Sequence, residues 1–134
     1  MIDHEFEIFS IIATALRSAV NPIYVAGEYV PQPPQFPCVF IVEVDNTVNM
    51  QTRDSGAIEN SANVMYEVDV YSNKAIGKKA ECKAIIALID EQFSHLGFTR
   101  AFLNPVQNLN DATVYRMTAR YRATIGKDNL VYRR

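Results

Sequence analysis

The 134-residue sequence has few of the residue types that most often carry chemistry. It contains no tryptophan, two histidines and two cysteines, and its five glycines are isolated from one another. The histidines and cysteines lack the spacing of a metal site, and neither a phosphate loop nor a Gly-x-Ser-x-Gly motif is present. The sequence therefore predicts a protein that is not an enzyme and that holds no cofactor or metal.

Long apolar runs are also missing. No stretch approaches the roughly 20 apolar residues that cross a bilayer, and the first residues are acidic, unlike those of a secretory signal. The formal net charge is -2, so no overall positive field draws the chain onto nucleic acid. Cys38 and Cys82 lie among apolar neighbours, which predicts buried free thiols in a reducing compartment. We expect a protein made on the cytosolic side, with no membrane partner.

The strongest structural pattern lies between residues 63 and 98. Apolar residues alternate with polar ones around Tyr66, which is typical of a strand with one buried face. From Gly77 to Leu96 the period changes to three and four residues, which predicts a long amphipathic helix. Gly97 then suits the left-handed residue that ends many helices. The expected buried stripe is Cys82, Ile85, Ile86, Ile89, Phe93 and Leu96, and the residues expected to face water are Lys78, Lys79, Lys83, Asp90 and Glu91.

The remaining segments complete one domain, residues 1–134. Residues 3–20 predict a helix and residues 23–25, 38–45, 98–108 and 113–125 predict strands, while four prolines make residues 30–37 an extended loop or edge. The helix at residues 3–20 has an expected stripe of Phe6, Phe9, Ala13, Leu16 and Val20, widened by Ile8, Ile12, Ala15 and Ala19. We expect an α+β fold, in which two helices pack on one face of a mainly antiparallel sheet of four or five strands. The other face of the sheet is expected to be uncovered.

Two polar segments interrupt this pattern. Residues 46–61 predict either a long protruding loop or two strands prolonged into a protruding hairpin. Residues 127–134 form a short basic tail, either loose or docked on a neighbour.

Charged residues on the predicted strands are the candidate site. Glu43 and Asp45 are expected on one face of their strand, as are Glu67 and Asp69, so paired strands would gather four carboxylates. Such a cluster would suit a metal-dependent nuclease. The alternative is a solvated face, or one matched by cross-strand ion pairs to Arg116, Arg120 and Arg122. We favour the alternative because no lysine completes a nuclease pattern.

The arginine row alternates with threonines, so it lacks the aromatic platform of a sheet that binds RNA. Charges of both signs suit contact between proteins, and complementary rows on one subunit permit head-to-tail assembly. The residues expected at a subunit or partner contact are Arg53, Asp54, Glu67, Asp69, Arg116, Arg120 and Arg122.

Three stretches of the chain resemble one protein family. They are residues 37–46 (PCVFIVEVDN), residues 66–98 (from YEVDVYSN through GKKAE to GF) and residues 110–125 (beginning NDATVYRMTARYR). In these stretches the chain resembles the tail terminator proteins of long-tailed bacteriophages and prophages, also called tail completion or tail-to-head joining proteins. With the N-terminal helix, the likeness covers nearly the whole chain. It lies in the order of elements and the type of residue.

The resemblance implies a small α+β virion protein that assembles as a hexameric ring. Such a ring ends polymerisation of the tail tube and meets the head connector, while DNA passes through its lumen without specific binding. The implied partners are further copies of the chain, the tail tube protein and the head connector or completion protein. The implied location is the tail–head junction, after assembly in the bacterial cytoplasm. The alternatives are a head-completion or minor capsid protein, the metal-dependent nuclease, and a cellular adaptor domain.

Overall fold

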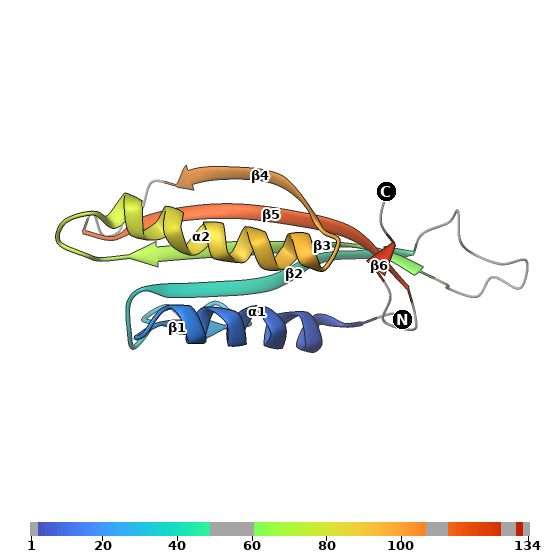
Figure 1. Ribbon diagram of the computed structural model, residues 1–134, viewed down its shortest axis with the longest axis horizontal. Helices are drawn as coiled ribbons and strands as arrows, with labels where there is room; N and C mark the ends of the chain where they lie inside the picture. Colours follow the sequence, from blue (N-terminus) through green and yellow to red (C-terminus); the bar gives the residue numbers. More distant parts are fainter. Residues whose placement is uncertain (1–2, 49–60, 107–112, 127–130, 133–134) are drawn as a thin grey trace, which may run out of the picture.

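A computed structural model describes residues 3–48, 61–106, 113–126 and 131–132. Two helices and six strands follow one another along the chain (Figure 1). In order they are α1 (Glu5–Ala19), β1 (Tyr24–Ala26), β2 (Cys38–Val48), β3 (Ser61–Ser72), α2 (Lys78–His95), β4 (Thr99–Val106), β5 (Tyr115–Gly126) and β6 (Val131–Tyr132). This arrangement confirms the α+β class that the sequence predicts.

The strands form one sheet in the order β1-β2-β3-β5-β4, and β6 pairs with β5 beyond the first residue of β4. β1 runs parallel to β2, and the other pairs are antiparallel. The prediction of a mainly antiparallel sheet is therefore confirmed. Neither of the two helices is long and apolar enough to cross a membrane, within the part of the chain that the structure describes.

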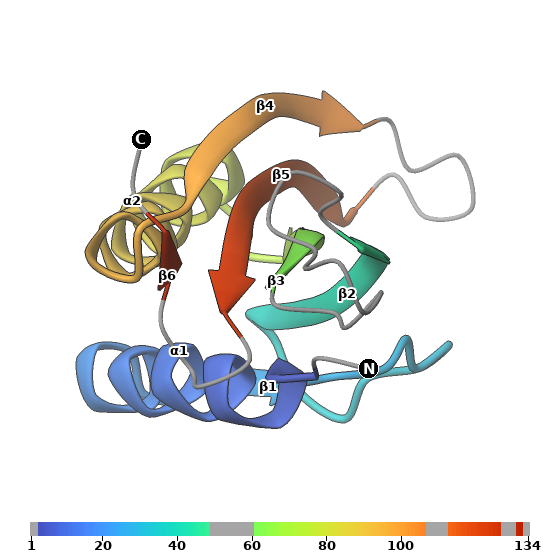
Figure 2. The same cartoon turned by 90° about the vertical axis from the view of Figure 1, so that its right-hand side faces the viewer.

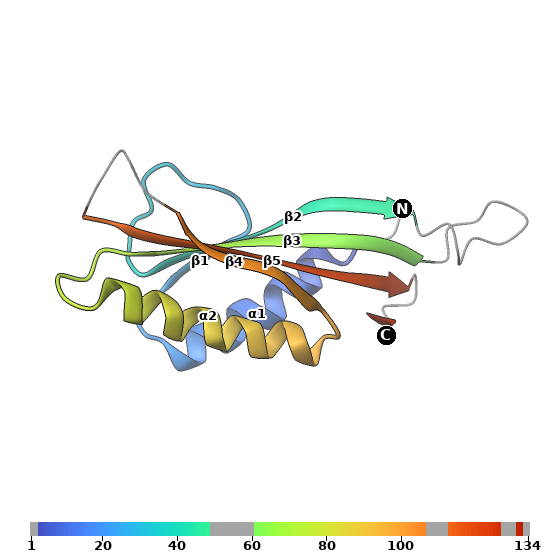
Figure 3. The ribbon, with the colours of Figure 1, turned by 90° about the horizontal axis from the view of Figure 1, so that it is seen from above.

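Both helices lie on the same face of the sheet, as predicted, and they contact each other (Figures 2 and 3). α2 buries the expected residues from Cys82 to Phe93, and Leu96 packs at the margin of the core. Asp90 is half-buried, and its carboxylate accepts hydrogen bonds from Arg100 at 3.0 Å and from Tyr121 at 3.1 Å. The prediction that Asp90 faces water is therefore only partly correct.

The buried side of α1 is rotated from the predicted stripe. Ile8, Ile12, Ala13 and Leu16 are its buried residues, whereas Phe6 is 80% exposed. The reason is that α1 contacts both α2 and β2. The buried side of α1 therefore faces both α2 and β2, and the fully buried Ile12 lies on that side. The expectation that Ile8, Ile12, Ala13 and Leu16 belong to the buried stripe is confirmed, whereas the prediction for Phe6 is wrong.

The long polar segment is partly strand. β2 continues to Val48 and β3 begins at Ser61, and Asn46 pairs with Val64 while Val48 pairs with Ala62. The prediction that the loop starts at residue 46 is therefore wrong, and the alternative of prolonged strands holds for these residues. Residues 49–60 lie outside the described part. In the predicted tail, Val131–Tyr132 pairs with β5, and the other residues of 127–134 are not described.

Candidate functional site

The candidate site lies on the sheet face opposite the helices. On β5 the even-numbered residues occupy this face, while Met117, Ala119 and Tyr121 point into the core. The register places Glu67 opposite Arg120 and Asp69 opposite Thr118. The two-residue alternation predicted for β3 and β5 is therefore confirmed, and it brings the acidic and basic rows side by side.

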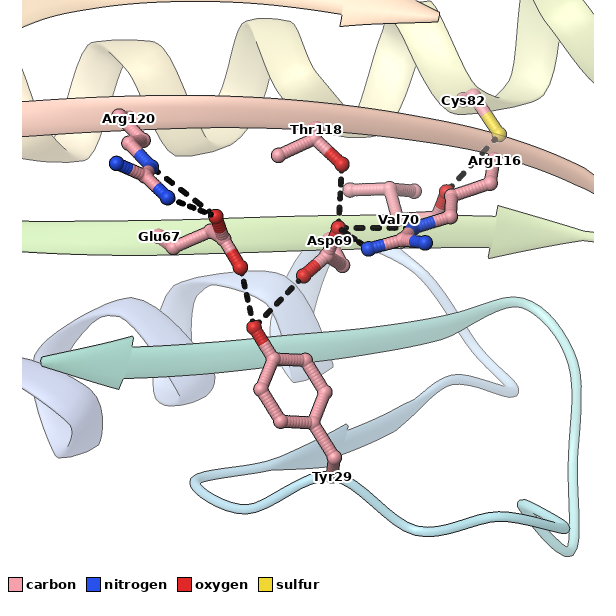
Figure 4. Close-up of polar contacts among 8 residues, drawn as sticks. All are labelled: Tyr29, Glu67, Asp69, Val70, Cys82, Arg116, Thr118 and Arg120. Atoms are coloured by element: carbon pink, nitrogen blue, oxygen red, sulfur yellow. Dashed lines mark hydrogen bonds and ion pairs between the residues drawn. The ribbon is translucent and has the colours of Figure 1, made fainter. Parts of the chain in front are cut away.

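Asp69 is a fully buried carboxylate at the centre of this face (Figure 4). Arg116 donates to its Oδ1 from Nε at 3.0 Å and from Nη2 at 2.8 Å, and the hydroxyl of Thr118 donates to the same oxygen. The hydroxyl of Tyr29 donates to Oδ2 at 3.0 Å. A buried carboxylate is tolerated only when such donors replace its lost hydration, so these residues are needed to keep Asp69 in the sheet.

Glu67 forms the second half of the network. The Nε and Nη2 atoms of Arg120 each lie 3.0 Å from its Oε1, and the Tyr29 hydroxyl donates to its Oε2 at 2.5 Å. Tyr29 therefore bridges the two carboxylates. The guanidinium of Arg120 also lies over the ring of Phe102, with 5.6 Å between its Cζ atom and the ring centroid, a favourable cation–π arrangement.

The network shifts the pKa values of its members. Partial burial alone would raise the pKa of Glu67, but the hydrogen bonds from Tyr29 and Arg120 outweigh it and lower that pKa. Burial, followed by the hydrogen bond to Glu67, raises the pKa of Tyr29. Burial would lower the pKa of Arg116, but its bond to Asp69 outweighs this and raises it. Glu67 and Arg116 are thus held charged, and the Tyr29 hydroxyl is held protonated, at neutral pH.

Tyr29 belongs to the segment between β1 and β2, which crosses this face of the sheet (Figures 3 and 4). Its ring lies 5.5 Å from that of Phe40, which lies 5.7 Å from the ring of Tyr71. The prediction that this face is uncovered is therefore wrong where Tyr29 lies over β2 and β3. Four prolines indicated an extended segment, but no pattern indicated that it returns across the sheet. Sequence reasoning missed Tyr29 for this reason.

The four carboxylates of the nuclease hypothesis do not gather. A bulge at Val44 shifts the register, so Glu43 pairs with Tyr66 while Asp45 pairs with Met65. Neighbouring residues on β3 point to opposite faces, so Glu43 and Asp45 do not share one, contrary to prediction. Glu43 lies on the helix side, where it accepts a hydrogen bond from the Tyr66 hydroxyl at 2.7 Å. The described residues include no group of three or more His, Cys, Asp or Glu that could hold a metal ion.

The residues predicted at a subunit or partner contact divide into three groups. Arg53 and Asp54 lie outside the described residues. Arg122 is exposed and lines an open cavity of about 570 Å³ together with Asp45 and Met65. Glu67, Asp69, Arg116 and Arg120 bind one another across strands, as in the ion-pair alternative. The expectation that these residues contact a partner stays a prediction.

Both cysteines are buried free thiols, as predicted. Burial raises the pKa of Cys38 to about 12 and that of Cys82 to about 12. Since the thiolate is the reactive form, neither residue is suited to act as a nucleophile.

The fold and the site define a small α+β protein in which ion pairs join the strands on the charged face of the sheet. No model of a known protein family matches the chain, and no curated protein matches it. One similar solved structure is the sheath/tube terminator of the PVC extracellular contractile injection system in its extended state. The identity is 10% and the TM-score 0.46, over 98% of this chain and 61% of that chain. A second is the tube-terminating cap of the anti-feeding prophage, at 10% identity and a TM-score of 0.43, over 96% of this chain and 58% of that one. The chain thus spans about three fifths of the length of these two proteins.

Proposed function

We propose that this chain is a virion structural protein of the tail terminator type. It assembles as a ring on the end of a tail tube, ends polymerisation of the tube and joins the tail to the head connector. One observation carries the proposal: the stretches that resemble this family form one continuous part of the fold. They supply β2, β3 with α2, and β5, and these three strands are neighbours in the sheet. The likeness therefore extends over the central unit of the molecule.

The chemistry of the described residues favours binding over catalysis. The carboxylates on the sheet face are satisfied by Arg116, Arg120 and Tyr29 within the same subunit. Both thiols are buried with raised pKa values. Neither set supplies a reactive group in an accessible place. These features suit a subunit whose surfaces meet further copies of itself, the tube protein and the connector.

The low net charge of -2 also suits this role. A strongly basic ring would bind the phosphates of DNA and hold it, because each neutralised phosphate releases counterions. A nearly neutral subunit leaves the DNA free to slide through the lumen. The proposed location is therefore the tail–head junction of the virion, after assembly in the bacterial cytoplasm.

The proposal is tested by mixing the purified chain with a tail tube protein from the same phage or prophage. We expect ring-shaped particles in electron micrographs, and tubes that carry a ring at one end and stop growing. An unrelated protein of similar size and charge serves as the control. A chain that stays monomeric and leaves tube ends bare and growing contradicts the proposal. Binding to the portal instead of the tube identifies a head-completion protein.

A further inference from the structure

One end of the molecule carries most of its lysines. Four of the five lysines lie within ten residues, in the turn between β3 and α2 and the first turns of α2. We call this surface the lysine end: Lys74, Lys78, Lys79 and Lys83, with Ile76 among them. The carboxylate within this segment, Glu81, accepts a hydrogen bond from the buried hydroxyl of Ser72 at 2.6 Å. Ile76 is 86% exposed, so an apolar side chain is presented to solvent between lysines.

The stability of α2 does not explain this position of the lysines. The N-terminus of a helix carries a partial positive charge, which disfavours cations in the first turn. Lys78 and Lys79 nevertheless occupy the first two positions of α2, where Glu81 is the acidic residue of the first turn and the N-cap residue, Gly77, supplies no side-chain cap. The positive charges of Lys78 and Lys79 are therefore unfavourable for the helix itself. Such a placement is expected where a positive surface binds another molecule.

The other end of the molecule carries carboxylates and apolar side chains. We call it the carboxylate end: Asp3, Glu5 and Glu7 at the start of α1, and Glu43 and Asp45 on β2. The two elements meet where the Glu43 amide donates to Glu5 Oε2 at 2.9 Å. The basic groups near this end include Arg122, Arg100, which is paired with Asp90 at 3.0 Å, His95, and His4, whose Nδ1 lies 3.9 Å from Glu7. Exposed apolar residues lie beside the acids, namely Phe6, Val44 and Val48.

These two surfaces lie at opposite ends of the longest axis of the molecule (Figures 1 and 3). They cannot meet within one copy. Each has exposed apolar residues flanked by charges, and the signs of the charges are opposite. The partner that fits the lysine end is therefore the carboxylate end of a second copy.

We infer that subunits of this protein bind one another head to tail, the lysine end of one copy against the carboxylate end of the next. The inference rests on the ring assembly proposed above and names its interface. The sheet face is less suited to this contact, because Glu67 and Asp69 are already paired with Arg120 and Arg116 inside the subunit. A contact between two different surfaces repeats from copy to copy, and it closes into a ring when the rotation between copies allows. Burial of Ile76 and Phe6 supplies the apolar contribution, and the charges select the orientation.

The inference is tested with two charge-reversed variants and their mixture. The lysine-end variant carries Lys78→Glu, Lys79→Glu and Lys83→Glu, and the carboxylate-end variant carries Asp3→Lys, Glu7→Lys and Asp45→Lys. Each variant alone presents the same sign at both ends, so we expect association at least about tenfold weaker than in the natural chain, measured by analytical ultracentrifugation. An equimolar mixture restores complementary ends, so we expect assembly to return in particles of alternating copies.

Matched controls separate this effect from misfolding. Glu28→Lys reverses an exposed charge in the segment between β1 and β2, which belongs to neither surface, and we expect it to assemble like the natural chain. Circular dichroism checks that each variant is folded. Unchanged assembly of both reversed variants, or failure of their mixture to assemble, overturns the head-to-tail contact but leaves the terminator proposal standing. A natural chain that forms neither rings nor tube caps contradicts both.

Discussion

Glu67 on β3 lies directly opposite Arg120 on β5, and their Oε1 and Nη2 atoms are 3.0 Å apart. This pair and its neighbour, Asp69 with Arg116, join the two central strands from the side that carries no helix. The acidic and basic rows therefore stabilise the folded chain. The surfaces that we infer to bind a second copy, the lysine end and the carboxylate end, lie elsewhere.

Replacement of the buried carboxylate should destabilise the subunit strongly. Asp69→Ala leaves Arg116 and Thr118 without their acceptor and opens a gap beneath Tyr29. We expect the free energy of unfolding to fall by about 3 kcal/mol, because loss of one partner of a buried pair leaves the other uncompensated. Urea unfolding followed by circular dichroism measures the change. Asp45→Ala, at an exposed carboxylate, is the matched control and should change stability by less than about 0.5 kcal/mol. Equal effects of the two replacements would show that the network adds nothing.

The hydroxyl of Tyr29 should matter more than its exposure suggests. Tyr29→Phe keeps the ring against Phe40 and removes the donor shared by Glu67 and Asp69. We expect a loss of about 1 kcal/mol, the usual contribution of a hydrogen bond, and a rise in the pKa of Glu67, measured by NMR titration of its carboxyl group. Tyr24→Phe is the control, since the ring of Tyr24 also lies against Phe40 at 6.5 Å. A Glu67 pKa that is the same in Tyr29→Phe and in the natural chain would contradict the bridging role.

The stability of the subunit should depend on pH through Glu67. The pKa of Glu67 is lowered in the folded state from 4.5, so the unfolded chain binds the proton more readily. The stabilisation is therefore present above the unfolded pKa and is lost as the pH falls through the lower folded pKa. We expect Glu67→Gln to be less stable than the natural chain at pH 7 and the difference to shrink below about pH 4.5. Chemical unfolding over a series of pH values measures both proteins. A difference that is constant with pH would rule out this contribution.

The two thiols should react only when the chain unfolds. Both are buried and have pKa values raised to about 12, so neither forms much thiolate at pH 8 in the folded state. We expect labelling by Ellman's reagent to be slow in buffer and complete for both cysteines in denaturant. Lys79→Cys places a third thiol at an exposed position and should label at once, which controls for the reagent. Rapid labelling of Cys38 or Cys82 in the folded natural chain would contradict their burial.

Local patterns were sufficient to predict much of the fold. The alternation along β3 and β5 and the three- and four-residue period of α2 follow from the geometry of a single strand or helix, so residues close in sequence reveal them. The pairing of β3 with β5, which places the acids beside the arginines, was only one of the possibilities, because neither adjacency nor register can be read from a single strand. The sequence therefore predicted the α+β class and the two faces of β3 and β5, and it gave the cross-strand ion pairs as one possibility beside a solvated face and a metal site.

The amino-acid sequence by itself determined which residues alternate, which helices are amphipathic and how few reactive groups the chain has. Only the tertiary structure decided that Tyr29 reaches Glu67, 38 positions away, that a bulge at Val44 turns Asp45 away from Glu43, and that Phe6 is exposed. It also decided that the lysines and the acids of α1 lie at opposite ends of the molecule (Figure 1). The reason is that these features depend on how distant segments pack, and packing is set by the shape of the whole core rather than by the period of any one segment.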